Sequence, residues 1–153
     1  MSKTRRKPAV EIAFEIETDE GIELERLWAR PVGPDRYRLE NTPIFAYGAS
    51  YRDVVEAELA DDATPVVRRM LEKSGHRTLR LLFEEEIDPS KATPELLDRL
   101  AERGCCWEGF SGRLVAIDIP AAIDFDGVVD LLQQSDVDWE HADPTHEELY
   151  GED

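Results

Sequence analysis

Two short segments carry the side chains best suited to chemistry. His76 lies in the turn 74–76, after Ser74 and Gly75, where a histidine can act as an acid–base group. Cys105 and Cys106 are adjacent, and a vicinal thiol pair can serve as a redox switch or a soft-metal site. A small enzyme, or a redox or metal protein using His76 or Cys105/Cys106, therefore stays open as one function. The alternatives are a histidine that hydrogen-bonds its turn and two reduced thiols that act as small apolar residues near a helix end.

A third group lies near the C-terminus, where two histidines and three acidic residues could bind a divalent ion: His141, Asp143, His146, Glu147 and Glu148. The two histidines are five residues apart, and Pro144 lies between them. This spacing matches neither one face of a strand nor an i,i+4 pair on a helix. A solvated acidic tail is therefore favoured, and we expect no metal ion, no cofactor and no assigned catalytic residue.

The charge of the chain bears on its partners. The sequence has 18 Lys and Arg against 35 Asp and Glu, a formal net charge of -17, and residues 114–153 contain no Lys or Arg. Such a charge repels phosphate backbones and anionic lipid and attracts basic surfaces. We therefore expect a basic protein partner, no nucleic acid and no membrane, while the oligomeric state stays open.

One tryptophan lies inside this acidic region. Trp139 is flanked by Asp136, Asp138, Glu140 and Asp143. An aromatic residue with an acidic rim is typical of a binding hot spot for a basic partner. These five residues are the predicted partner-binding site of an acidic macromolecule-binding protein, for example an inhibitor or immunity-type antagonist of a basic protein. The alternative for Trp139 is simple burial on a final strand.

Short strands joined by Gly, Pro and Asp turns fill the first half of the chain. Apolar and polar residues alternate from Val10 to Glu17, and further strands are expected at 24–29, 36–40, 54–59 and 66–71. Strands of this length and spacing predict a small antiparallel β-sheet or barrel at residues 9–73. Trp28 is expected in its core.

A mixed pattern follows, with a boundary near Gly75. Strands are expected at 78–83, 114–119 and 137–142, with helices at 94–103 and 124–132; Gly104 is the expected helix stop. The order predicts an α+β fold in which the N-terminal lobe packs on a C-terminal βαβαβ, ferredoxin-like unit at 77–146. Trp107 is expected to pack between helix and sheet. Residues 1–8 and 147–153 are expected to be mobile tails.

The strands of the second lobe also carry apolar residues on the face opposite the helices. Leu82, Leu114 and Ala116 lie on that face. A solvated face would be polar, so we expect the N-terminal lobe to cover them and the two lobes to form one unit.

Six segments of the sequence resemble an uncharacterised bacterial family, domain-of-unknown-function family 4265. They are residues 24–30, 37–45, 53–57, 74–78, 104–108 and 116–120. The resemblance covers most of residues 9–145 and implies a cytosolic bacterial protein, without implying an activity, a cofactor or a catalytic residue. A cytoplasmic location also fits the two unpaired thiols and the lack of an apolar segment after the basic N-terminus.

Overall fold

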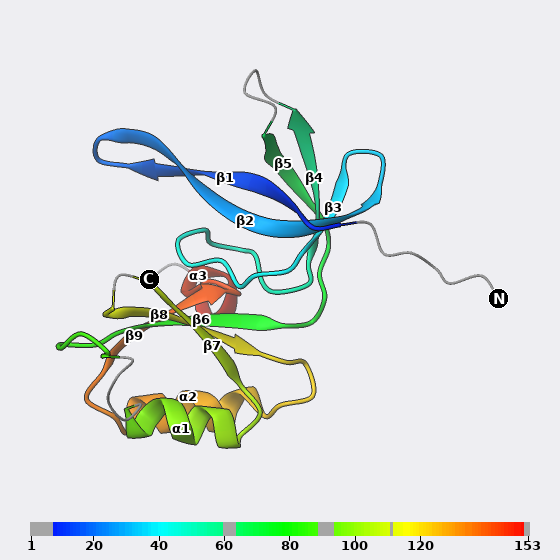
Figure 1. The fold of residues 1–153 in the computed structure, drawn as a ribbon. Coiled ribbons are helices and arrows are strands. Elements are labelled where there is room, and N and C mark those ends of the chain that lie inside the picture. Colours follow the sequence, from blue (N-terminus) through cyan, green and yellow to red (C-terminus); the bar gives the residue numbers. More distant parts are fainter. Residues whose placement is uncertain (1–7, 60–63, 89–93, 111, 152–153) are drawn as a thin grey trace.

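The alternating pattern at the start of the chain becomes the first strand of a barrel. The computed structural model describes residues 8–59, 64–88, 94–110 and 112–151. The barrel strands are β1 (Val10–Thr18), β2 (Gly21–Gly33), β3 (Arg36–Leu39), β4 (Val54–Leu59) and β5 (Pro65–Glu72). Consecutive strands pair in antiparallel fashion, and a parallel contact between Ala13 of β1 and Val66 of β5 closes the barrel (Figure 1). The predicted N-terminal sheet or barrel is thus a closed barrel with one parallel pair.

The barrel core is built from alternate residues of its strands. Its buried members are Ile12, Leu27, Ala29, Leu39, Ala49 and Val55. Because Leu27 and Ala29 both point inward, the pleat turns Trp28 outward, opposite Glu11 of β1. Trp28 is 52% exposed, so its predicted core position is wrong.

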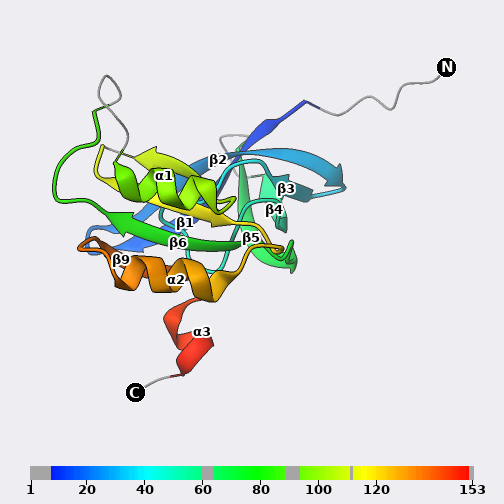
Figure 2. The same cartoon turned by 90° about the horizontal axis from the view of Figure 1, so that it is seen from below.

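The second lobe is a four-stranded sheet with two helices on one face. Its elements are β6 (Arg77–Leu82), α1 (Glu95–Glu102), β7 (Cys106–Phe110), β8 (Leu114–Ile119), α2 (Phe125–Gln133) and β9 (Asp138–Asp143). The strand order is β7-β8-β6-β9, with antiparallel neighbours throughout. Figures 1 and 2 show α1 and α2 side by side on the face away from the barrel. The α+β fold with an N-terminal β lobe is confirmed.

Strand β7 is an element of the second lobe that the sequence did not predict. Trp107 was expected between helix and sheet; it pairs with Ile117 and so lies on the helix-side face, but on this edge strand it is 37% exposed. The lobe therefore contains one strand more than the predicted βαβαβ order.

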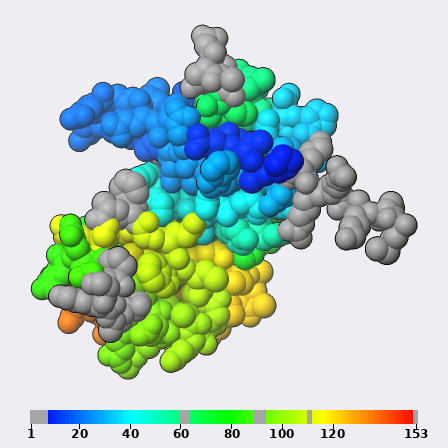
Figure 3. Space-filling view, viewed as in Figure 1, coloured from blue at the N-terminus to red at the C-terminus, as the bar shows by residue number. Residues whose placement is uncertain are grey.

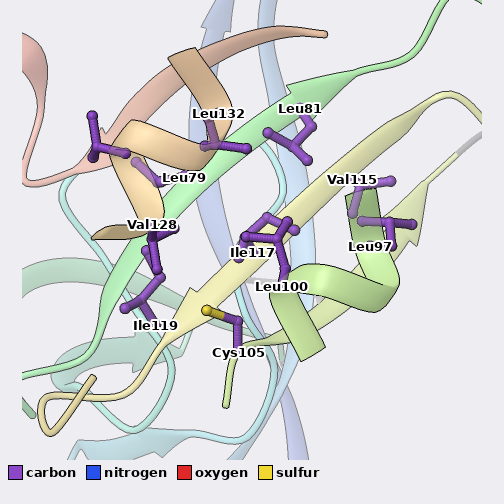
Figure 4. Close-up of a cluster of buried hydrophobic side chains, with 11 residues drawn as sticks. Leu79, Leu81, Leu97, Leu100, Cys105, Val115, Ile117, Ile119, Val128 and Leu132 are labelled. Carbon is purple, nitrogen blue, oxygen red and sulfur yellow. The ribbon is translucent and has the colours of Figure 1, made fainter. Parts of the chain in front are cut away.

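The core of the second lobe lies between the sheet and the helices (Figure 4). Leu79 and Leu81 of β6 and Val115 and Ile117 of β8 point toward the helices at every second position. Gly104 ends α1 with φ +100°, and a Cβ at this position would lie 2.7 Å from a methyl carbon of Ile123. The predicted helix stop is confirmed, and both conformation and space favour glycine there.

The opposite face of the sheet meets the barrel only in part. Ala116 is fully buried and Leu114 is half-buried, whereas Leu82 is 43% exposed. The expected cover is therefore complete at Ala116 and missing at Leu82. The loop of residues 40–53, between β3 and β4, lies between the barrel and the sheet and supplies much of this cover (Figure 1).

The C-terminal end of the chain forms a short helix. Helix α3 (His146–Tyr150) begins with a capping box, in which Thr145 and Glu148 each bond the other's backbone N–H. This helix occupies part of the predicted tail at 147–153. Residues 1–7 and 152–153 of the two predicted tails lie outside the described residues.

Candidate functional site

The 40–53 loop is held from the barrel side by a buried carboxylate. Glu25 is 9% exposed and accepts hydrogen bonds from the backbone N–H groups of Ile44, Phe45 and Ala46, at 2.6 to 3.2 Å. These three donors belong to a segment without secondary structure, so Glu25 supplies the partners that a strand would otherwise give them. Glu108 of β7 holds the loop in the same way, accepting from the Thr42 N–H and the Asn41 amide.

Arg80 of β6 holds the loop from the sheet side. Its guanidinium donates to the carbonyl oxygens of Phe45 and Ala46 and lies 4.5 Å from the ring centroid of Tyr47. Its Nη1 is also 3.5 Å from Glu140 of β9. Because Arg80 is only 6% exposed, these contacts replace part of the water that the guanidinium loses on burial, while its Nε has no hydrogen-bond partner among the described residues.

A second polar cluster joins the lobes at the far end of the loop. The ammonium of Lys73 lies 2.6 Å from Asp53 and 2.5 Å from Asp143. The hydroxyl of Ser50 donates to Asp143 and is 2.7 Å from that of Thr78. Both hydrogen bonds to Lys73 raise its pKa against the opposing effect of burial. This lysine cluster contains two buried carboxylates and one cation.

His76 forms a pair with a carboxylate rather than with a thiol. Its Nδ1 is 2.8 Å from Asp118 Oδ1, and the ring of Tyr51 meets it edge-on at 5.4 Å. Its backbone N–H also bonds Ser74 in the turn, the simpler role considered for this residue. Burial raises the pKa of Asp118, while the bond to His76 lowers it. The pair fixes the orientation of the imidazole.

The two thiols lie in different environments. Cys105 is 5% exposed, and Figure 4 shows it in the core beneath α1, next to Ile119. Burial raises its pKa to about 11, so the nucleophilic thiolate is scarce at neutral pH. Cys106 is exposed and stands opposite Asp118 in the β7–β8 register. Cys105 thus has the apolar, buried position of a structural cysteine.

The predicted partner-binding residues are divided between surface and interior. Asp136, Asp138 and Glu140 are exposed, and Trp139 is half-buried against the core of the second lobe. Asp143 is 4% exposed and belongs to the lysine cluster, so it does not contribute to an outer surface. Strand β9 is an edge of the sheet. The structure thus groups four of the five residues on or beside this edge.

A groove borders the same edge. It lies between α2, β9 and α3, has a volume of about 1060 Å³, and is hereafter the β9–α3 groove. Its lining residues are Tyr47, Val129, Gln133, Trp139, Glu140, His141, Thr145, His146, Glu147 and Tyr150. Sequence reasoning missed Tyr47 and Tyr150. Tyr150 lies close behind the acidic stretch in sequence, whereas Tyr47 gave no signal, since its bond to Glu140 spans 93 residues.

Another groove, of about 650 Å³, lies under the β1–β2 hairpin. Ile16, Leu27, Ile44 and Phe45 contribute apolar walls, and Glu25 and Glu108 line it while bound to the loop. Figure 3 shows the hairpin, in blue, projecting from the barrel over the second lobe. Both carboxylates are occupied by backbone donors, so this groove offers shape and apolar surface rather than a free acid–base pair.

Two further features of the described residues concern metal binding and membrane insertion. In this part of the chain, no group of three or more His, Cys, Asp or Glu is placed to hold a metal ion. No helix among these residues combines the length and apolar character needed to cross a bilayer.

The comparisons with known proteins agree with this fold. The family model described as "Domain of unknown function (DUF4265)" matches residues 25–142. The comparison with curated proteins gave no match. Among solved structures, a hypothetical protein from Neisseria gonorrhoeae is similar, with a TM-score of 0.74 and 14% identity over 93% of this chain and 97% of that one. This likeness concerns the fold alone. Because the family model spans most of the sequence, the resemblance found there is confirmed, and the chain belongs to the family described as Domain of unknown function (DUF4265).

Proposed function

We propose that this protein binds a basic protein through the acidic edge, defined as Asp136, Asp138, Trp139 and Glu140. The observation that carries the proposal is the placement of exposed carboxylates around a half-buried tryptophan on an edge strand. In the described part of the chain, no ion pair involves Asp136 or Asp138. Their charges are therefore available to a partner, and Trp139, whose side chain packs on the helix side of the same strand, supplies apolar area at this edge.

The long-range charge supports the same class of partner. The segment 114–153 holds twelve Asp and Glu and no Lys or Arg, so the field of this lobe is negative over a wide area. Such a field raises the rate at which a basic protein arrives, and opposes a nucleic acid or an anionic membrane. More specifically, we propose a cytoplasmic bacterial inhibitor, or immunity-type antagonist, of a basic protein, because such a protein depends on electrostatic attraction to reach its target.

The topology supports a ferredoxin-like description of the second lobe. The chain order β6-α1-β7-β8-α2-β9 and the sheet order β7-β8-β6-β9 correspond to a split βαβ arrangement with both helices on one face. In this description β9 is an edge strand that another chain can approach over residues 138–140, whereas at Ala142 the backbone carbonyl already accepts from the Gly48 N–H.

The experiment is a pull-down from the source cells, followed by association kinetics with the recovered basic protein. We expect the association rate to fall steeply as salt is raised, because screening shortens the range of the field. The double change Asp136→Asn and Asp138→Asn should slow association. The matched control, Asp126→Asn with Asp130→Asn, removes the same charge from exposed positions on α2 and should have a smaller effect. Equal rates for the two double variants would contradict the proposal.

Acid–base chemistry at His76 is the second candidate, favoured by its 2.8 Å contact with Asp118. A carboxylate that orients an imidazole is a recurring part of catalytic sites. Here a hydrolase substrate panel, assayed with wild type and with His76→Gln, is the test. A turnover lost in that variant would favour an enzyme, and equal rates in both would discard this candidate.

A further inference from the structure

We infer that the β9–α3 groove is a pocket for an arginine side chain. This inference rests on the proposed function and adds the chemical group that the basic partner would insert. The acidic edge accounts for the long-range attraction of a basic partner, whereas the groove would bind one of that partner's side chains at the interface.

Aromatic rings form much of the groove. The ring of His141 lies 5.1 Å from that of Trp139, edge-on, and 5.9 Å from that of Tyr150. His146 lies 4.9 Å from Tyr150, and Tyr47 completes the set from the 40–53 loop. Tyr150 is 64% exposed, so its ring presents free surface, whereas the Tyr47 ring, 57% exposed, already has the Arg80 guanidinium over it at 4.5 Å. A guanidinium is planar and weakly hydrated, and it stacks on such rings more readily than an ammonium does.

The charges in the groove select a cation. Two carboxylates, Glu140 and Glu147, line it, and none of its lining residues is Lys or Arg. Glu140 already accepts a hydrogen bond from Tyr47 and lies 3.5 Å from Arg80. No ion pair in the described part of the chain involves Glu147, and this residue is exposed at the start of α3. Glu147 is therefore the carboxylate that a guanidinium would pair with.

One residue that lines the groove contains a buried polar atom without a partner. His141 is 6% exposed, and its Nδ1, which is covered from solvent, has no hydrogen-bond partner among the described residues; the Nε atoms of Arg38 and Arg80 are in the same state. A guanidinium would therefore reach this nitrogen only after the imidazole ring moves. Burial, followed by the proximity of His146, lowers the pKa of His141, so the ring is neutral at pH 7. A buried polar atom without a partner is costly, and native proteins rarely keep one without a use. A guanidinium has five N–H donors and can bond both a carboxylate and a neutral imidazole nitrogen.

The wall on α2 suits the stem of the same side chain. Val129 and the aliphatic part of Gln133 line the groove there. The methylene groups of an arginine can lie along this wall while its head reaches the rings and Glu147. Apolar wall, aromatic rings and carboxylate thus match the three parts of one arginine side chain.

The test uses the tripeptide acetyl-Gly-Arg-Gly-amide, titrated into the full chain and followed by NMR through the Trp139 indole N–H. The control peptide carries citrulline, which has the same shape without the charge. We expect saturable shifts with the arginine peptide and about tenfold weaker binding with citrulline, the effect of about one charge-assisted hydrogen bond. Glu147→Gln and Tyr150→Leu should each weaken binding, whereas Glu102→Gln, an exposed position on α1, should not.

Equal shifts with both peptides, absence of saturable shifts, or equal effects of Glu147→Gln and Glu102→Gln would overturn the inference. Each of these results is separate from the proposed function. If the groove fails while Asp136→Asn with Asp138→Asn still slows association with a basic partner, the acidic edge stands and the arginine pocket is wrong. If arginine binds but that double change has no more effect than its control, the pocket stands and the edge is wrong.

Discussion

Lys73 is the residue whose removal tests the joint between the two lobes most directly. It follows β5 of the barrel, and its ammonium meets Asp53, at the end of the 40–53 loop, and Asp143 of β9. The change Lys73→Met keeps most of the aliphatic stem and removes the charge. Two carboxylates then remain buried without their cation.

The expected loss of stability follows from burial. The side chain of Asp53 is 0% exposed and that of Asp143 is 5% exposed, while that of Lys73 is 44% exposed. Removing one partner of a fully buried ion pair costs about 3–5 kcal/mol. Water that already reaches Lys73 can solvate part of the uncovered charge, and Ser50 and Ser74 still donate to these carboxylates. We therefore expect a loss of about 2–3 kcal/mol, below the fully buried range.

The assay is urea unfolding at pH 7, with Arg69→Met as the matched control. Arg69 also pairs with a carboxylate across strands, but its side chain is 66% exposed and that of Glu56 is 29% exposed. Exposed pairs contribute about 0–1 kcal/mol, so the control should change little.

A loss for Lys73→Met no larger than that for Arg69→Met would refute this reasoning. It would mean that the cluster is solvated in solution, or that its geometry contributes nothing to holding the lobes.

Three further predictions concern other positions. The change Glu25→Gln replaces one accepting oxygen by an NH2 donor, which faces the three backbone N–H groups that Glu25 bonds. We expect the free energy of unfolding, measured with heat or urea, to fall by about 1–3 kcal/mol. An unchanged unfolding midpoint would show that the loop does not need this carboxylate. The change Ala116→Leu enlarges a fully buried side chain and should lower the free energy of unfolding by about 1–3 kcal/mol. The change Leu82→Ala, at the uncovered end of the same face, should lower it by well under that amount. A larger loss for Leu82→Ala than for Ala116→Leu would contradict the described cover. At pH 8 iodoacetamide should label Cys106 and spare Cys105, because the Cys105 pKa of about 11 leaves roughly one thiol in a thousand as thiolate. The rate of Cys105 labelling should rise with pH until that pKa is reached. Equal labelling of the two cysteines at pH 8 would contradict the burial of Cys105.

The elements of the fold follow closely from local patterns. Period-two alternation predicted the strand at 10–17, which the structure extends to Thr18, and the strand Leu114–Ile119 has the predicted bounds. Gly104 marked the end of α1 because its positive φ is a local requirement. Strand β7 was missed because its apolar residues, Cys106, Trp107 and Phe110, do not alternate with polar ones, and because Glu108, which faces the 40–53 loop, is acidic. A charge on a buried face breaks the pattern from which strands are predicted.

The same cause misplaced two side chains. Glu25 shares the inward face of β2 with Leu27 and Ala29, so the alternation of apolar and polar residues does not mark the buried face, and Trp28 was expected in the core although it lies on the other face. Asp143 resembled a surface residue, because its partner Lys73 lies 70 positions away in the sequence. Composition predicted the acidic edge, but the division of its residues between surface and interior depends on these distant contacts.

The cores of the two lobes share no residue, which has a consequence for how this family can diverge. The barrel core and the helix–sheet core are separate sets of apolar side chains, and each can accept compensating changes of volume within itself. The 40–53 loop is different, since it depends on Glu25 from the barrel and on Arg80 and Glu108 from the sheet. A mutation at one of these three leaves buried donors or acceptors without partners that no neighbouring methyl group can replace. Across the family, we therefore expect substitutions in one core to occur independently of those in the other. The residues at positions 25, 80 and 108 and the length of the 40–53 loop should instead change together or not at all.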